Sequence, residues 1–247
     1  MITLSPSSKA EMLELGFHDD LVDVVPPGVD PRFSPAGQRD ADPTVLAVGR
    51  LEPVKRLDRL IRAVAEARRH VPTLRLTVVG SGHLRADLEA LVDDLGAGEA
   101  VTFAGHVADD ELLRLYRRSW MVASSSVREG WGMTLTEAAA CATPAVATRI
   151  AGHVDAVDHG VSGLLATDEH ELAEHIATVA GDPVVRDRLG AGALAHAGRF
   201  TWEATAVDIL GALADDSHRR RDRVGRVRTG RGRAGLVRAG RVRALRV

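Results

Sequence analysis

Short apolar runs alternate with amphipathic segments along most of the chain. Several of these runs are apolar at successive positions instead of alternate ones, which is typical of parallel β-strands that are covered on both faces. Their lengths also match those of strands in globular proteins. The candidate strands are Thr44–Gly49, Leu74–Gly80, Ala100–Gly105, Trp120–Ser124, Pro144–Thr148 and Gly163–Ala166.

The segments between these runs show helical periodicity. Leu57, Leu60, Ile61, Val64 and Ala65 follow the i, i+3, i+4, i+7, i+8 stripe of a helix that is buried along one side. An alternating β-α order predicts right-handed crossovers and a doubly wound parallel sheet, a Rossmann-like α/β fold. Ligands of such sheets bind beyond the carboxyl ends of the strands. Further helices are expected over residues 83–96, 109–119 and 134–142.

The two ends of the chain have a different character. "MITLS" is consistent with one more strand, Ser8–Gly16 with a short helix, and Val24–Phe33 with a stiff linker rich in Pro and Gly. Residues 201–216 favour a last helix. Residues 217–247 are a low-complexity mixture of Arg, Gly, Val and Ala, which predicts a disordered basic tail.

Composition adds a charge asymmetry to this picture. The formal net charge is −2, but the twelve Arg and one Asp of residues 217–247 conceal a net charge of about −13 on the remainder. The single cysteine, Cys141, excludes an intramolecular disulfide and fits a reducing cytosol. Neither a signal peptide nor a membrane-spanning run is recognisable. We therefore expect a cytoplasmic protein, with a peripheral position at the inner membrane face as an alternative.

Two cations follow the first of the six candidate strands, in "GRLEPVKRLDRL". Arg50 and Lys55 flank the expected start of a helix, where orphan backbone amides add to the side-chain charge and favour phosphate groups. The alternative is a surface ion pair of Arg50 or Lys55 with Glu52, worth at most about 1 kcal/mol.

The glycines after the second candidate strand, in "VVGSGHL", also have two interpretations. Gly80 and Gly82 permit close approach of a ligand to the backbone. The segment lacks the third glycine of a dinucleotide-binding fingerprint, however, so a tight turn between strand and helix is equally consistent with it.

The segment "REGWGMTLTEAAA" places two carboxylates around a glycine-rich loop. Glu129 is expected at the carboxyl end of a strand and Glu137 in the following helix, and each carboxylate can accept hydrogen bonds from a vicinal diol. Gly130 and Gly132 leave backbone amides exposed beside a helix N-terminus, which favours an anion there. The alternatives are a solvated loop charge for Glu129 and, for Glu137, a capping box with Thr134.

Taken together, these motifs resemble the C-terminal domain of the retaining GT-B-fold glycosyltransferases of family four. The resemblance is carried by "VGRLEPVKRLDRLI", "VVGSGH", "VTFAGHV" and "EGWGMTLTEAAA", in the family's order and spacing, and it extends from about Met1 to about Leu213. It implies that residues 44–200 are a domain that binds a nucleotide sugar. Residues 1–43 would then hold the last strand and helix of an N-terminal domain and the interdomain linker.

The resemblance also implies roles for individual residues. Arg50 and Lys55 correspond to the family's cations on the donor diphosphate, and with Glu129, which would contact the transferred sugar, they form the implied catalytic set. Glu137 would hold the ribose hydroxyls. Further implied donor-binding residues, in the turns near the nucleoside and in the loop that lines the sugar and phosphate site, are Gly80, Gly82, His106, Val107, Gly130, Trp131, Gly132, Met133, Thr134 and Leu135.

The chain departs from the family pattern in several places. Ala142 and Ala151 replace glycines, Asp155 replaces a common Glu, and Pro27 replaces an Asn. The chain also starts at what resembles the last strand of the family's N-terminal domain. We therefore expect a truncated or frame-shifted reading frame, or one half of a split enzyme whose partner is a separate N-terminal-domain chain.

Other candidate sites are less favoured. Asp40-Ala41-Asp42 matches a metal-binding D-x-D motif of a different transferase fold, but it lies in a polar loop. His170 and His175 are five positions apart and do not share a helix face, and the remaining histidines fall mostly on polar faces. Cys141 is expected to be a small core residue. The tail has no aromatic residues for stacking, so no specific nucleic acid is expected.

The leading hypothesis is therefore a hexosyltransferase-type enzyme. It would transfer a sugar, with retention, from a UDP- or GDP-sugar to the hydroxyl of an unidentified acceptor, without a cofactor or an obligatory metal. The alternatives are a non-catalytic nucleotide-sugar-binding half that needs a partner chain, and a sugar-nucleotide epimerase of the same fold.

Overall fold

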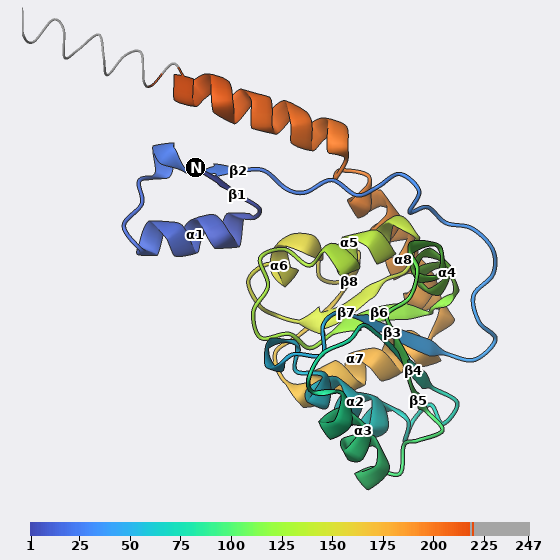
Figure 1. Cartoon of the computed structure of the whole chain (residues 1–247). Helices are drawn as coiled ribbons and strands as arrows, with labels where there is room; N and C mark the ends of the chain where they lie inside the picture. Colours follow the sequence, from blue (N-terminus) through green and yellow to red (C-terminus); the bar gives the residue numbers. More distant parts are fainter. Residues whose placement is uncertain (218, 220–247) are drawn as a thin grey trace, which may run out of the picture. The chain divides into compact units, whose positions relative to one another are not determined.

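The computed structural model describes residues 1–217 and residue 219, which fall into two units, Met1–Thr205 and the residues from Ala206 onward. Apart from residues 217 and 219, the predicted basic tail lies outside the described residues. The first unit contains a six-stranded, entirely parallel sheet with the order β5-β4-β3-β6-β7-β8 (Figure 1). Its strands are β3 (Thr44–Val48), β4 (Arg75–Val79), β5 (Val101–Gly105), β6 (Met121–Ser124), β7 (Ala145–Thr148) and β8 (Gly163–Ala166).

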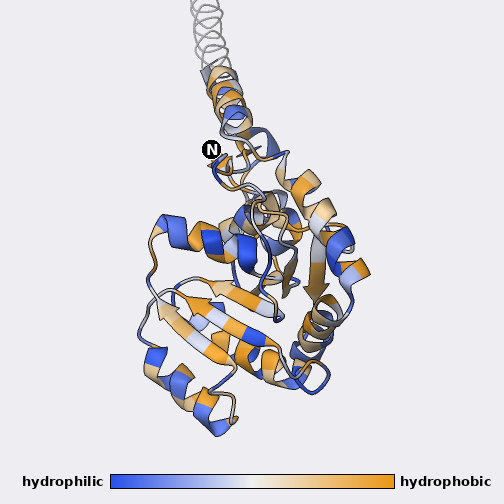
Figure 2. Cartoon of the chain, turned by 90° about the vertical axis from the view of Figure 1, so that its right-hand side faces the viewer, coloured by the Kyte–Doolittle hydropathy of each residue, from blue (hydrophilic) through white to orange (hydrophobic). Residues whose placement is uncertain are grey.

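The sheet is apolar on both faces, as the uninterrupted hydrophobic runs predict. In β3, Val45 and Ala47 belong to one buried cluster and Leu46 belongs to the cluster on the opposite face. Figure 2 shows the same contrast, with largely hydrophobic strands and helices that carry both kinds of residue. The predicted doubly wound α/β fold is therefore confirmed.

Helices cover both faces of this sheet. The core on one face is formed mainly by α2 (Leu57–Ala67), α3 (Arg85–Asp94) and α7 (Glu169–Gly181), with α7 packed on α2. The core on the other face is formed mainly by α4 (Asp109–Arg118), α5 (Met133–Ala140) and α8 (Pro183–Ala197), with α8 packed on α5. The short α6 (His153–Ala156) contributes to this second core and contacts α5.

The strand order creates a switch point between β3 and β6. These two strands are neighbours, yet β3 leads towards α2 on one face and β6 leads towards α5 on the other. The ends of the two strands and the residues that follow them line one hollow, the crevice at the carboxyl ends of the strands, which is where open α/β sheets bind ligands.

The first 43 residues form a small element and an extended connection. As predicted, β1 (Ile2–Thr3) and α1 (Pro6–Glu14) are present, and β1 pairs in parallel with β2 (Asp23–Val24) after a short 3-10 turn at Asp19–Leu21. The Ser5 hydroxyl caps α1 by accepting the Ser8 amide at 3.1 Å. The connection then follows residues 200–205, where the Val29 amide donates to the Phe200 carbonyl at 2.9 Å.

The predicted last helix is present over residues 202–217. Among the described residues, no helix combines the length and the apolar composition that crossing a bilayer requires.

Candidate functional site

Both predicted cations lie at the switch point. After β3 the chain makes a short 3-10 turn, Pro53–Lys55, and α2 starts at Leu57, behind an Arg56 in the left-handed region with φ of 45°. Lys55 thus ends this turn instead of flanking the first residue of α2. Arg50, which is exposed, and Lys55 line one hollow together with Ser124, Ser125 and Ser126 from the end of β6.

Lys55 reaches across the crevice to Glu129. Its Nζ lies 2.5 Å from Oε1 of Glu129, and the two side chains are 24% and 19% exposed. The predicted surface pair with Glu52 is wrong, because Glu52 pairs with Nδ1 of His83 at 3.1 Å. Among the described residues, Arg50 has no side-chain hydrogen bond or ion pair, so its guanidinium is available to a ligand.

Glu129 is not the solvated loop charge that the sequence also allowed. Its Oε1 accepts a second hydrogen bond, from the Ser126 hydroxyl at 2.8 Å. Burial favours the neutral carboxyl, but the hydrogen bonds from Lys55 and Ser126 outweigh it, and the pKa of Glu129 is lowered. Glu129 is therefore held as an ionised carboxylate beside Lys55, in the loop that follows β6.

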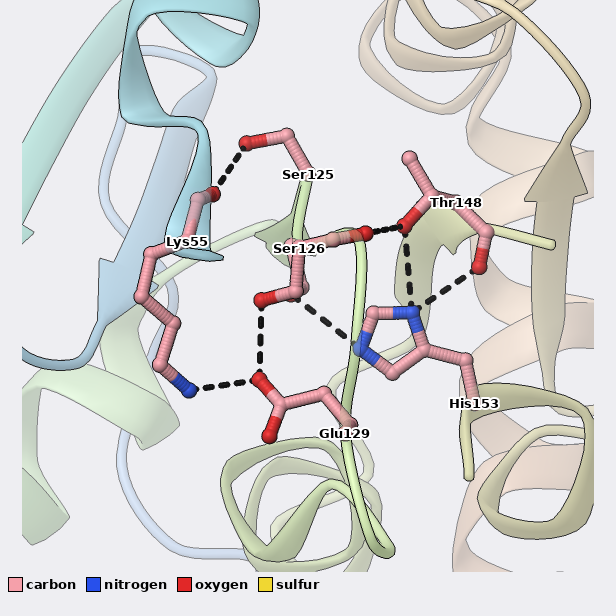
Figure 3. Close-up of polar contacts among 7 residues, drawn as sticks. Lys55, Ser125, Ser126, Glu129, Thr148 and His153 are labelled. Carbon is pink, nitrogen blue, oxygen red and sulfur yellow. Dashed lines mark hydrogen bonds and ion pairs between the residues drawn. The ribbon is translucent and has the colours of Figure 1, made fainter. Parts of the chain in front are cut away.

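Ser125 joins the backbones of the two loops. Its hydroxyl lies 3.0 Å from the Lys55 carbonyl (Figure 3). The same hydroxyl lies 2.7 Å from the Arg56 carbonyl. The Val127 amide also donates to the Val54 carbonyl at 2.9 Å. The backbone that carries Lys55 is thereby fixed to the loop that carries Glu129.

A buried histidine extends the polar contacts on the other side of Glu129. His153, at the start of α6, is 1% exposed and lies within hydrogen-bonding distance of Thr148 (Figure 3). It also lies within hydrogen-bonding distance of Ser124. Burial lowers its pKa, which favours the neutral imidazole. Most of the remaining described histidines are exposed, as expected, and the exceptions are His153 and His196, which is buried beside Phe200.

The glycine-rich loop turns its one large side chain inward. Trp131 is 3% exposed and packs edge-to-face on Phe200, with 5.0 Å between the ring centroids. Gly132 takes a left-handed conformation, φ +109°, and precedes the first residue of α5, Met133. Nothing lies within 4 Å of the Cβ position of Gly130. The loop therefore offers a ligand its backbone, not the indole ring of Trp131.

Glu137 lies in α5 and accepts a hydrogen bond from the Tyr116 hydroxyl at 2.8 Å. The predicted capping box is wrong, because α5 already starts at Met133 and Thr134 is inside the helix instead of capping it. Burial raises the pKa of Glu137, although the Tyr116 hydrogen bond and the charge of Arg32 oppose that change. No hydrogen bond or ion pair between described residues links Glu137 to Arg50, Lys55 or Glu129.

The structure thus brings three of the four predicted charged groups together and places Glu137 in separate surroundings. Charges near Glu137 come from Arg32 and Asp30 in the connection before β3 and from Asp109 at the start of α4. Of the other predicted donor-binding residues near α4, His106 is exposed and Val107 packs partly into the core. Met133 and Thr134 are half-buried and Leu135 is buried in the first turn of α5.

Gly80 and Gly82 pack against the loop after β3. A Cβ on Gly80, whose φ is +131°, would lie 1.9 Å from the Gly49 carbonyl oxygen, and one on Gly82 would lie 2.4 Å from that of Leu51. Backbone hydrogen bonds join the same segments, including Leu51 N–H to Ser81 O at 2.9 Å. The tight-turn interpretation therefore accounts for both glycines, and their contact with a donor stays a prediction.

The disfavoured candidates have structural partners. Asp40 pairs with Arg118 and Asp42 with Arg75, while His170 pairs with Glu66 and His175 with Glu171. Within the described ranges no group of three or more His, Cys, Asp or Glu side chains is arranged to hold a metal. Cys141 is buried, as expected, and burial raises the pKa of its thiol to about 11.

Several polar residues at the site were not predicted. They are Ser124, Ser125, Ser126, Tyr116, Thr148 and His153. The one signal in the sequence was the run of three serines at the carboxyl end of a predicted strand. His153 and Tyr116 gave no comparable signal, because the partners that link them to the site, Ser124 and Glu137, are more than 20 positions away in sequence.

Comparison with known proteins gives a consistent result. The family model described as glycosyl transferases group 1 matches residues 31–196. A D-inositol 3-phosphate glycosyltransferase of Stackebrandtia nassauensis is 42% identical over 89% of this chain and 55% of its own length. Its counterpart from Acidothermus cellulolyticus is 37% identical over 90% of this chain and 54% of its own length. The chain thus spans about half the length of these curated relatives.

Solved structures share the fold. Anabaena HepE in complex with UDP and glucose has a TM-score of 0.77 and 25% identity, over 86% of this chain and 62% of HepE. Sucrose-phosphate synthase from Thermosynechococcus elongatus has a TM-score of 0.78 and 26% identity, over 88% of this chain and 58% of that protein. The six-stranded sheet is accordingly a Rossmann-like half of a GT-B fold, and the chain belongs to the glycosyl transferases group 1 family.

Proposed function

We propose that this chain is the donor-binding half of a glycosyltransferase that uses a nucleoside-diphosphate sugar, with UDP as the favoured nucleotide. The observation that carries the proposal is the cluster of Arg50, Lys55 and Glu129 at the switch point between β3 and β6. Two kinds of similarity support it. The relatives named above are glycosyltransferases, and HepE has been solved with UDP and with UDP-glucose.

Each of the three residues would bind a particular part of the donor. Lys55 is held by Glu129 and Arg50 is unpaired among the described residues, so the two cations would bind the diphosphate and stabilise the negative charge that develops as it leaves. In this proposal the two cations stabilise the leaving diphosphate in the way that a bound metal ion would, so the reaction does not require a metal. Glu129 would accept hydrogen bonds from hydroxyls of the transferred sugar.

The remaining donor contacts extend towards α4 and α5. Glu137 would accept the ribose hydroxyls, and backbone amides from Gly130 to Leu135 would face the sugar and phosphate. The turns at Gly80, Gly82, His106 and Val107 would lie near the nucleoside. This part of the assignment rests on the family resemblance more than on contacts within the chain.

We also propose that transfer is retaining, of the family-four type, and that the transferred group is a hexose. An acceptor hydroxyl needs a binding site of its own. Because the chain matches about half the length of its relatives, we propose that further polypeptide, on the same protein or on a partner chain, contributes that site. We place the reaction in the cytoplasm.

Isothermal titration calorimetry against uridine, UDP, UDP-glucose and GDP-mannose tests the donor assignment. We expect saturable binding of UDP-glucose, with a tighter complex for UDP than for uridine because of the two cations. A folded sample that releases no heat with any of these compounds would refute the proposal.

Product analysis by ¹H NMR tests the type of reaction. Retaining transfer predicts that slow hydrolysis of UDP-α-glucose first releases α-glucose, whereas β-glucose as the first product contradicts retention. Interconversion of the sugar without an acceptor would favour the epimerase instead. Binding without turnover would favour the non-catalytic half that requires a partner.

A further inference from the structure

A series of polar side chains leads from His153 to Glu129. Nε2 of His153 lies 3.2 Å from Oγ of Ser124, which lies 3.2 Å from Oγ of Ser126. Ser126 in turn donates to Oε1 of Glu129 at 2.8 Å (Figure 3). The series joins α6 to the carboxylate that is paired with Lys55.

Hydrogen-bond chemistry fixes the tautomer of His153. Nδ1 lies 2.8 Å from the Thr148 carbonyl oxygen, which can only accept, so Nδ1 carries a proton. The Thr148 hydroxyl, 3.3 Å from the same nitrogen, already donates to the Ser126 carbonyl at 2.6 Å and can therefore only accept from His153 as well. In a neutral imidazole Nε2 is then an acceptor, and it accepts a hydrogen bond from the Ser124 hydroxyl.

Each serine hydroxyl has a single proton to donate. The proton of Ser126 is directed at the Glu129 carboxylate, and with neutral His153 the proton of Ser124 is directed at Nε2. No proton then lies between the two serine oxygens. If His153 becomes protonated, Nε2–H donates to Ser124, whose own proton turns to Ser126, and the series becomes one continuous donor chain that ends on Glu129.

The charges that face His153 are Glu129, which favours the imidazolium form, and Lys55, which opposes it. Most charged residues on the elements packed against α6 are engaged elsewhere. On α1, Lys9 pairs with Asp19 and Glu11 lies 3.8 Å from Arg128, whereas Glu14 is exposed and has no side-chain partner among the described residues. On α5, Glu137 is bonded to Tyr116, and within α6 itself Asp155 accepts the Ser7 amide.

The backbone of α6 also touches Glu129 directly. Gly152, at φ +83°, precedes His153, and a Cβ there would lie 2.5 Å from the Glu129 carbonyl oxygen and 3.0 Å from the Trp131 amide nitrogen. This close approach requires glycine. The residues at the start of α6 thus contact Glu129 in two ways: Gly152 packs against its main chain, and His153 is linked to its carboxylate through Ser124 and Ser126.

We propose that His153 is a positioning residue for Glu129, which acts through Ser124 and Ser126 and couples the protonation state of the imidazole to that of the carboxylate. The effect on donor binding rests on the proposed function, whereas the coupling itself is a property of the free protein. The two therefore have separate tests.

NMR of histidine ring nitrogens in the free protein tests the coupling. We expect His153 to be the Nδ1–H tautomer at neutral pH, and its pKa to fall further in Glu129→Gln, which removes the negative charge. This fall should become smaller in a Ser126→Ala background, where the series is interrupted. An Nε2–H tautomer, or an equal effect of Glu129→Gln with and without Ser126, would overturn the proposal whether or not a donor binds.

Calorimetry with UDP-glucose and UDP tests the positioning role. His153→Asn keeps a donor for Thr148 but cannot reach Ser124, and Ser124→Ala breaks the next contact. Both should weaken UDP-glucose binding about tenfold and leave UDP binding within about twofold. His153→Gln, whose longer amide can accept from Ser124, should recover part of the loss.

Matched controls separate positioning from general damage to the core. His196→Asn changes a second buried histidine, and Ser119→Ala removes a buried hydroxyl that donates to the Leu115 carbonyl. Equal losses in His153→Asn and His196→Asn, or in Ser124→Ala and Ser119→Ala, would overturn the positioning role. Failure of the unmodified protein to bind UDP-glucose would refute the proposed function instead, and the NMR result would still decide the coupling.

Discussion

Glu129 stands between Lys55 and Ser126 in a loop, whereas Glu137, eight positions later, lies against the buried ring of Tyr116 in a helix. The first carboxylate has an ion-pair partner and a lowered pKa, and the second has a hydroxyl donor, partial burial and a raised pKa. A shared motif has thus placed two identical side chains in opposite electrostatic surroundings. The surroundings of Glu129 favour the ionised carboxylate, whereas those of Glu137 favour the neutral carboxyl.

Glu129→Gln is expected to have the largest effect on ligand binding. Loss of a charged acceptor for sugar hydroxyls should weaken UDP-glucose binding about 10- to 100-fold. UDP should bind as well as before or better, because Lys55 is released for the phosphates. Calorimetry with both ligands measures the difference.

Glu137→Gln is the matched control for that experiment. It should weaken UDP and UDP-glucose by the same factor, since both contain the ribose. If the two variants lose both ligands equally, the division of labour between the two carboxylates is wrong.

Arg50→Ala should have a smaller effect, restricted to the phosphates. Because this guanidinium is exposed, its contribution is screened by salt. We expect UDP affinity to fall about 5- to 10-fold at low ionic strength, with uridine unchanged. Arg69→Ala, an exposed arginine just beyond the carboxyl end of α2, provides the control, and an equal loss for uridine and UDP would remove Arg50 from the diphosphate site.

The pH dependence of stability distinguishes the two carboxylates without any ligand. A lowered folded-state pKa means that Glu129 stabilises the protein above its unfolded pKa, and that this contribution disappears as pH falls through the folded value. For Glu137 the folded pKa is the higher one, so the folded state binds more protons between the two values and stability falls as pH rises through that window.

Urea unfolding across the acidic range measures these slopes. Relative to the unmodified protein, Glu129→Gln should make stability rise less steeply with pH, and Glu137→Gln should make it rise more steeply. Shifts of the same sign in both variants would show that the contrast between their surroundings is absent in solution.

Trp131→Phe, between the two carboxylates in sequence, should have the smallest effect. The indole Nε1 is buried and has no hydrogen-bond partner within the described part of the chain, so its loss removes an unsatisfied donor while packing on Phe200 is largely kept. We expect a stability change below about 1 kcal/mol and unaltered UDP-glucose binding, against about 3–5 kcal/mol for Trp131→Ala. A marked loss of binding in Trp131→Phe would mean that the indole contacts the ligand.

The sheet was predictable because its strands are buried on both faces and read as apolar runs; β8 was predicted to the residue. Helix α8 was not predicted, although Asp182 caps it and Pro183 starts it. Its glycines disfavour a helix locally, yet they permit close packing: a Cβ on Gly190 would lie 2.7 Å from the Ala142 carbonyl oxygen, and one on Gly192 would lie 2.0 Å from that of Val161.

The location of Arg50, Lys55 and Glu129 was predictable, because each residue follows the carboxyl end of a predicted strand. That of His153 was not, because it meets Ser124 through the pairing of β6 with β7, where Ser124 lies opposite Ala147. The capping box at Thr134 failed for a local reason, since Gly132 takes a left-handed conformation and α5 starts one residue earlier than expected.

The backbone contact between Gly80 and Gly49 has a consequence for engineering. A Cβ atom on Gly80 would lie only 1.9 Å from the Gly49 carbonyl oxygen. The turns after β3 and β4 therefore have no room to shift independently. A graft that transplants one of them to alter donor preference must carry the other with it, and a library that diversifies residues 49–51 will retain folded members only if Gly80 and Gly82 are kept.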